Sequence, residues 1–121
     1  MVKKALLIGI NYHKNTRYKL NGCINDAIYT SHLLIDAYNY SYDNITIMRD
    51  DIYSLENNDA LFPSRENIIR ELENIFANSN EDDELWIHYS GHGHFIIDKN
   101  NDEKDNYDEL IMCIGKNNRL I

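Results

Sequence analysis

The sequence is poor in the residues that several classes of protein depend on. It has one proline, five glycines and two cysteines in 121 residues, and 20 acidic residues outnumber its 12 lysines and arginines. Cys23 and Cys113 form no C-x-x-C pair, which argues against a disulfide framework or zinc ribbon and favours a reducing compartment. The net charge of −8 argues against nucleic acid as a partner, because phosphate binding needs clustered basic residues.

Long apolar runs are also absent. No segment approaches the ~18 apolar residues of a membrane-spanning helix, and the apolar run within residues 1–10 is too short for a signal peptide. We therefore expect no membrane partner and a soluble, cytoplasmic protein. The length suits one domain, which we place at residues 1–121. Acidic loops fit cationic partners better, either basic peptides or divalent metal ions.

Apolar segments alternate with amphipathic ones along the first three quarters of the chain. Three short apolar runs predict strands, at residues 4–10, 45–48 and 85–90. Between them we predict two helices. The first is capped by Asn25 or Asp26 and ends near Tyr40. This alternation is typical of βαβ units, so we predict an α/β fold with a parallel sheet flanked by helices.

The second helix and the last part of the chain complete this pattern. Ser64 is the predicted cap of the second helix, whose apolar face carries Ile68, Leu72, Ile75 and Phe76. After Gly93, residues 95–97 and 110–114 flank a charged segment without a helix between them. We predict a C-terminal antiparallel hairpin there.

A strand that stops in Ser-Gly-His-Gly is the most informative stretch of the sequence. His92 follows a run rich in Trp, Ile and Tyr, at the carboxyl end of a strand, where catalytic groups collect in open α/β sheets. Gly91 and Gly93 give the backbone room to expose the imidazole. His92 is thus a candidate general base for a thiol or hydroxyl nucleophile, with an ordinary loop histidine as the alternative.

Three histidines close together also suggest zinc. His88, His92 and His94 provide enough imidazoles for a zinc site. Strand geometry argues against one, because His88 lies inside the strand and we expect its side chain to point into packing.

The acidic segment at residues 98–109 suggests calcium. Its carboxylates follow part of the EF-hand spacing, but Glu103 occupies the position that needs glycine, and strands replace the flanking helices. A looser site of oxygen ligands, for which we name Asp102, Asp105 and Asp108, remains open beside a solvated hairpin tip.

The two cysteines have different predicted environments. Cys23 lies where the first helix starts, so the helix dipole could lower its thiol pKa, although a small buried filler is the alternative. Cys113 lies between Met112 and Ile114 and is predicted to be a core residue.

Five blocks in this order resemble the metacaspases, the caspase-like cysteine peptidases. They are Lys4-Ala-Leu-Leu-Ile-Gly-Ile-Asn-Tyr12, Leu20-Asn-Gly-Cys-Ile-Asn-Asp-Ala27, Phe62-Pro-Ser-Arg-Glu-Asn-Ile68, His88-Tyr-Ser-Gly-His-Gly93 and Asp105-Asn-Tyr-Asp-Glu109. The resemblance implies a caspase-hemoglobinase α/β sandwich and, in active members, cleavage of proteins after Arg or Lys. Many members are activated by calcium.

The resemblance also implies roles for individual residues. His92 matches the catalytic histidine that pairs with a cysteine nucleophile, and Gly93 belongs to the turn whose amide helps to form the oxyanion hole. Asp26 matches an acidic residue of the pocket for the basic side chain, and Cys23 matches a secondary cysteine beside it.

One block of the family pattern is absent. The nucleophile of the family lies in Asp-x-Cys-x-Ser-Gly, and this sequence contains no such block; Cys113 lacks its flanking residues. We therefore expect an incomplete domain, ending before the strand that carries the nucleophile and inactive alone. The alternative is a naturally shortened regulatory protein that binds partners or itself through the exposed edge of the third strand.

Overall fold

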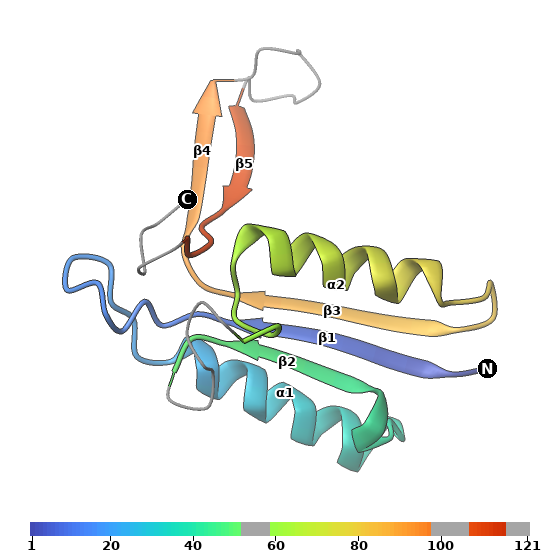
Figure 1. Ribbon diagram of the computed structural model, residues 1–121. Coiled ribbons are helices and arrows are strands. Elements are labelled where there is room, and N and C mark those ends of the chain that lie inside the picture. The colour runs from blue at the N-terminus through green and yellow to red at the C-terminus, as the bar shows by residue number, and fades with distance from the viewer. Residues whose placement is uncertain (52–58, 98–106, 116–121) are drawn as a thin grey trace.

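The structure is a computed structural model, which describes residues 1–51, 59–97 and 107–115. A three-stranded sheet lies between two helices, and a two-stranded hairpin extends from it (Figure 1). In chain order the elements are β1 (Lys3–Gly9), α1 (Cys23–Tyr38), the 3-10 helix η1 (Tyr42–Asn44), β2 (Ile45–Arg49), α2 (Arg65–Ala77), β3 (Glu84–Ser90), β4 (Gly93–Ile97) and β5 (Tyr107–Ile111).

The sheet is parallel and has the order β2-β1-β3. Ala5 of β1 is in register with Ile45 of β2 on one side and with Trp86 of β3 on the other. β4 and β5 pair antiparallel, as predicted, but β5 begins at Tyr107, three residues before the predicted position. The prediction of an α/β fold with a mostly parallel sheet and a hairpin is confirmed.

From Ala5 onward β1 is apolar and buried, because both of its faces are covered there. Leu6 and Ile8 pack in the cluster that contains Ile68 of α2, whereas Ala5 and Leu7 pack in the cluster that contains Leu34 of α1. The alternation of a strand thus divides one apolar run between two cores. None of these four β1 residues is more than 2% exposed. Burial of each leucine side chain to this extent contributes about 1.5–3 kcal/mol to the stability of the fold.

α1 begins earlier than predicted because its cap comes from another part of the chain. Neither Asn25 nor Asp26 caps it. The side-chain Oδ1 of Asn11 accepts the backbone N–H groups of Cys23 at 2.9 Å and Ile24 at 3.4 Å. At the other end Asn39 has φ 64°, so an asparagine provides the left-handed C-cap where glycine is common.

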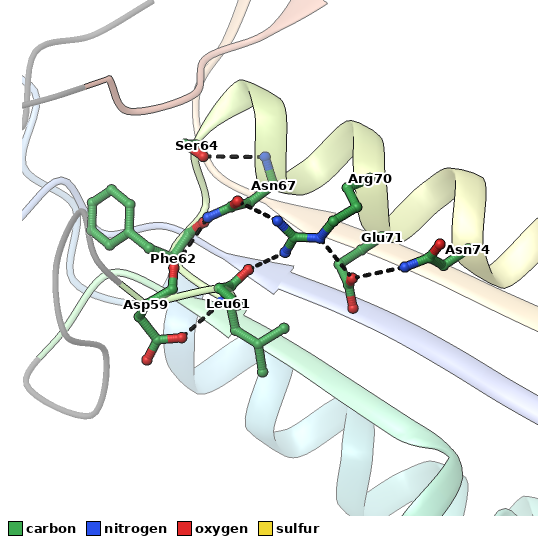
Figure 2. A network of polar contacts seen from close by, with 9 residues as sticks. Asp59, Leu61, Phe62, Ser64, Asn67, Arg70, Glu71 and Asn74 are labelled. Atoms are coloured by element: carbon green, nitrogen blue, oxygen red, sulfur yellow. Dashed lines mark hydrogen bonds and ion pairs between the residues drawn. The ribbon is translucent and has the colours of Figure 1, made fainter.

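α2 begins as predicted. Ser64 Oγ accepts the N–H of Asn67 at 3.2 Å. Figure 2 shows how the next turn holds the preceding loop: Asn67 Nδ2 donates to the carbonyls of Asp59 and Phe62 at 3.1 and 2.9 Å. Arg70 donates to Asn67 Oδ1 at 2.6 Å and to the carbonyl of Ala60. These contacts fix the entry into α2 without a glycine.

One residue of the predicted apolar face of α2 was assigned wrongly. Leu72 and Ile75 pack against the core cluster of Ile68, whereas Phe76 is 58% exposed. At 3.6 residues per turn, Ile75 lies about 20° from the direction of Ile68 and Phe76 about 80° from it. Among the helices of the described residues, none is long and apolar enough to cross a membrane.

Candidate active site

His92 lies in the turn between β3 and β4, at the carboxyl end of the parallel sheet. Its Nε2 is 2.7 Å from the backbone carbonyl oxygen of Tyr18. A carbonyl only accepts hydrogen bonds, so this contact assigns the proton to Nε2 and leaves the lone pair of the neutral ring on Nδ1. The imidazole therefore has one orientation and one tautomer, which a loop histidine in solvent lacks.

Two tyrosine rings surround the imidazole. The Tyr12 ring centroid is 4.9 Å from that of His92, and the Tyr18 ring meets His92 edge to face at 5.9 Å. These contacts leave His92 half-buried. The ring is therefore held by packing as well as by its hydrogen bond.

The two glycines beside His92 differ in how tightly the structure surrounds them. A Cβ on Gly91 would lie 2.4 Å from the Tyr89 phenol oxygen and 2.9 Å from that of Tyr12. Gly91 therefore allows the two phenols to approach the turn. A Cβ on Gly93 would be 3.7 Å from the Leu110 carbonyl, an ordinary contact. No glycine of the described residues has a positive φ.

Asp26 reaches the same end of the sheet from α1. Ser90 Oγ donates to Asp26 Oδ2 at 3.3 Å, and the oxygen of Ser90 accepts from His88 Nε2 at 2.9 Å. Ser90 is two residues before His92, so the fold brings the exposed Asp26 carboxylate and the imidazole to one strand end. His88, which we predicted to point into packing, is half-buried, and its ring bonds to Ser90.

The prediction that the Cys23 thiol has a lowered pKa is wrong. Burial raises its pKa, and the nearby carboxylates of Asp26 and Asp50 raise it further. Loss of hydration and two negative charges together outweigh the partial positive charge of the helix N-terminus. Cys113 is buried, with a pKa also raised by burial, and the prediction that it belongs to the core is confirmed.

The candidate metal ligands fall mostly outside the described residues. Within the described residues, no three side chains of His, Cys, Asp or Glu gather as a metal site would require. Asp102 and Asp105 lie in the range that is not described, and the side chain of Asp108 in β5 is not described either. Calcium binding therefore stays a prediction.

Three residues of the site were not predicted as functional. Tyr12 and Tyr18 contact His92, and the 3% exposed Asp50 follows β2 at the same end of the sheet as His92. The rule that pointed to His92, the carboxyl end of a parallel strand, could have identified Asp50. The partners of the Tyr12 phenol lie 77 or more positions away, so no local pattern indicates them.

A parallel sheet between two helices, with a held imidazole at its carboxyl end, defines a caspase-like α/β protein. Residues 3–119 match the family described as "Metacaspase, peptidase C14 domain", and the chain belongs to this family.

Curated relatives agree with this assignment. Metacaspase-1 of Schizosaccharomyces pombe is 42% identical over 109 residues, which are 90% of this chain and 24% of that protein. Metacaspase-1 of Meyerozyma guilliermondii is 41% identical over 112 residues, which are 93% of this chain and 26% of that protein. The chain thus spans about a quarter of the length of these relatives.

A solved structure shares the fold. Protein GSU0716 from Geobacter sulfurreducens superposes with a TM-score of 0.62 at 25% sequence identity. The match covers 92% of this chain and 38% of that one.

Proposed function

We propose that this chain is part of a metacaspase-type cysteine endopeptidase in which His92 is the general base. The observation that carries the proposal is the 2.7 Å contact between His92 Nε2 and the Tyr18 carbonyl. It leaves the lone pair on Nδ1 of a fixed ring, and a base for a thiol needs a lone pair held in one direction.

The proposed reaction is acyl transfer to a cysteine that lies beyond this chain. His92 Nδ1 takes the thiol proton, and the thiolate forms a C–S bond to the scissile carbonyl carbon. The imidazolium then protonates the leaving amine as the C–N bond breaks, and the same base activates water to hydrolyse the thioester. The Gly93 amide is the proposed oxyanion donor. Because the sequence lacks an Asp-x-Cys-x-Ser-Gly block, we expect the chain to be inactive alone.

The proposed substrates are proteins with Arg or Lys before the cleaved bond. Asp26 supports this specificity, since its carboxylate is exposed at the same strand end as His92 and is oriented by Ser90 at 3.3 Å. A carboxylate in this position pairs with guanidinium or ammonium. Cys23 lies one turn earlier on α1, and we propose that it lines the same substrate pocket.

Calcium is the proposed activating ion, with Asp102, Asp105 and Asp108 as its ligands. The support is the family and the acidic sequence of residues 98–109. Titration calorimetry of the chain with CaCl₂ tests binding directly. We also place the protein in the cytoplasm, consistent with its free Cys23 and Cys113.

A chimera tests the proposed activity. Residues 3–119 would replace the matching segment of the Schizosaccharomyces pombe relative, so that the rest of that protein supplies the later blocks. We expect cleavage of Arg and Lys peptides, and a loss of about 10³-fold or more in His92→Ala. His32→Ala, an exposed histidine on α1, is the matched control. Unchanged cleavage in His92→Ala would overturn the assignment.

A second candidate function is partner binding without catalysis, as a decoy or regulator. β3 pairs with β1 along one edge, and within the described residues no strand covers its other edge. Ile87 of β3 is 42% exposed. An uncovered edge pairs readily with another strand, and a second copy of this chain is the simplest partner. Sedimentation equilibrium showing a monomer at every concentration would contradict this candidate.

A further inference from the structure

We propose that Asp50 is a positioning residue for both halves of the site, acting through Asn11 on the Asp26 carboxylate and through Tyr12 on the His92 imidazole. The inference rests on the proposed function for its consequence in catalysis. Its structural part concerns only this chain.

Asp50 anchors the backbone that leaves β1. It is 3% exposed, and its two carboxylate oxygens accept different amides, Asn11 N–H at 2.9 Å and Tyr12 N–H at 2.8 Å. A carboxylate at such a depth is costly unless it is hydrogen-bonded, and here each oxygen has a backbone partner. His13 Nδ1 lies 3.6 Å from Oδ2, beyond hydrogen-bonding distance.

The anchored backbone has an unusual conformation. Tyr12 has φ 54°, in the left-handed region that large side chains rarely adopt. Such a conformation persists only where the surrounding structure holds it, and the Asp50 contact to the Tyr12 amide provides that hold. It directs the buried Tyr12 ring toward His92, with ring centroids 4.9 Å apart.

The Tyr12 phenol binds the turn that carries His92. Its oxygen accepts the His92 N–H at 2.9 Å and donates to the Met112 carbonyl at 2.7 Å. Tyr89, whose phenol oxygen is 3.0 Å away, donates to the His92 carbonyl at 2.6 Å. Both sides of the His92 residue are thus bound by phenols. Burial raises the pKa of Tyr12 and of Tyr89, so both remain protonated at neutral pH.

Asn11 acts on the other half of the site. Its Oδ1 accepts the first amides of α1, those of Cys23 and Ile24, and Gly22 provides no side-chain cap of its own. Asp26 is on the first turn of α1. The start of the helix, and with it the position of Asp26, therefore depends on the residue that Asp50 holds.

Hydrogen exchange in the 121-residue chain tests the effect on His92. In Tyr12→Phe the ring remains and the phenol oxygen is lost, so we expect the His92 amide to exchange about tenfold faster or more. Rates are normalised to a β1 core amide, that of Leu6, to remove any change in global stability. Tyr40→Phe is the matched control, because its phenol donates to Glu84 at the other end of the sheet. An unchanged normalised rate in a folded Tyr12→Phe chain overturns the proposal.

Three further variants separate the effect on His92 from the effect on the start of α1. Asp50→Asn removes an acceptor from the pair of amides and should speed exchange at His92 and at Cys23 and Ile24. Asn11→Ala should affect only the two α1 amides, and Asn11→Asp should restore their protection because it keeps an acceptor oxygen. The proposal fails if Asp50→Asn speeds exchange only at His92 or only at the two α1 amides. It also fails if Asn11→Asp exchanges as fast at those amides as Asn11→Ala.

The same variants in the chimera connect position to catalysis. Tyr12→Phe should lower kcat with KM for an Arg peptide nearly unchanged, and Asn11→Ala should chiefly raise KM. A raised KM in Tyr12→Phe and a lowered kcat in Asn11→Ala would contradict the assignment of Tyr12 to His92 and of Asn11 to Asp26. Unchanged cleavage in His92→Ala overturns the proposed function alone, whereas loss of cleavage in His92→Ala with unchanged exchange in Tyr12→Phe overturns the positioning role alone.

Discussion

The two ends of the parallel sheet each bury a tyrosine, and they use it differently. At the carboxyl end Tyr12, 2% exposed, bonds the backbone of His92 and of Met112. At the amino end Tyr40, 4% exposed, makes a side-chain bond to Glu84 at 2.7 Å. A buried phenol must find partners in either place. At the carboxyl end the phenol bonds backbone outside the helices and strands, and in this way it holds the turn that carries His92.

Other polar contacts at the amino end stabilise regular structure. Lys3 Nζ donates to the carbonyl of Tyr38 and Lys4 Nζ to that of Asn78, both at the C-terminal ends of helices, where a positive charge is favourable. A cavity of about 220 Å³ is lined by residues of β1, η1, β2 and α2 together with Asn78, and by none that contacts His92. This cavity and the His92 imidazole thus lie in different places.

The largest expected effect concerns the close contact of β1 and α1 at the carboxyl end. A Cβ on Gly9 would lie 2.5 Å from the Cys23 carbonyl oxygen and 2.9 Å from Ile24 Cα, both backbone atoms that cannot move aside. We expect Gly9→Ala to lower the free energy of unfolding by about 1–3 kcal/mol or more, measured with urea. Gly22→Ala, with nothing within 4 Å, should lose well under that amount. Equal losses would show that the contact is not tight.

The two ends of α2 offer a smaller, matched comparison. Ser64 accepts an otherwise unpaired amide at 3.2 Å, whereas Ser79 only adds a donor to the Ile75 carbonyl. We expect Ser64→Ala to cost about 1 kcal/mol of unfolding free energy and Ser79→Ala clearly less. Thermal unfolding followed by circular dichroism measures both. The reverse order would contradict the role of Ser64 as the cap.

Alkaline pH should gradually lower the stability of the fold, through the buried tyrosines at both ends of the sheet. Burial and then the Glu84 hydrogen bond raise the pKa of Tyr40 to about 12, whereas an unfolded tyrosine titrates near about 10. Between these values the unfolded chain binds fewer protons, so stability is intact below about 10 and falls as pH rises. The raised pKa values of Tyr12 and Tyr89 act in the same direction. In urea titrations between pH 9 and pH 11, Tyr40→Phe should make the free energy of unfolding fall less steeply with pH. An unchanged slope would show that Tyr40 does not cause the decline.

Sequence reasoning succeeded where the determinants are local. The apolar run of β1 and the cap at Ser64 are each contained in a few neighbouring residues, and both were predicted correctly. The start of α1 was wrong because Asn11 caps it from 12 positions away. The position of Phe76 was wrong because one residue of helical rotation decides which side chain faces the sheet.

The residues of the site also differ in whether local sequence signals indicate them. His92 was predicted from a strand end and a glycine turn, which are local signals. The contact of Asp26 with Ser90 joins positions 64 apart, and that of Tyr12 with His92 joins positions 80 apart. Only the resemblance to a family indicated Asp26, and nothing in the pattern indicated Tyr12. Contacts that depend on tertiary structure leave no trace in spacing.

The most direct test of the site concerns the proton on the His92 ring. Nitrogen NMR of the 121-residue chain, at a pH where the imidazole is neutral, reports which nitrogen carries it, and the exposed His32 serves as an internal reference. The contact with the Tyr18 carbonyl predicts the Nε2–H tautomer, with the lone pair on Nδ1. A predominant Nδ1–H tautomer, or a mixture like that of His32, would contradict the role of His92 as a base held ready for a thiol.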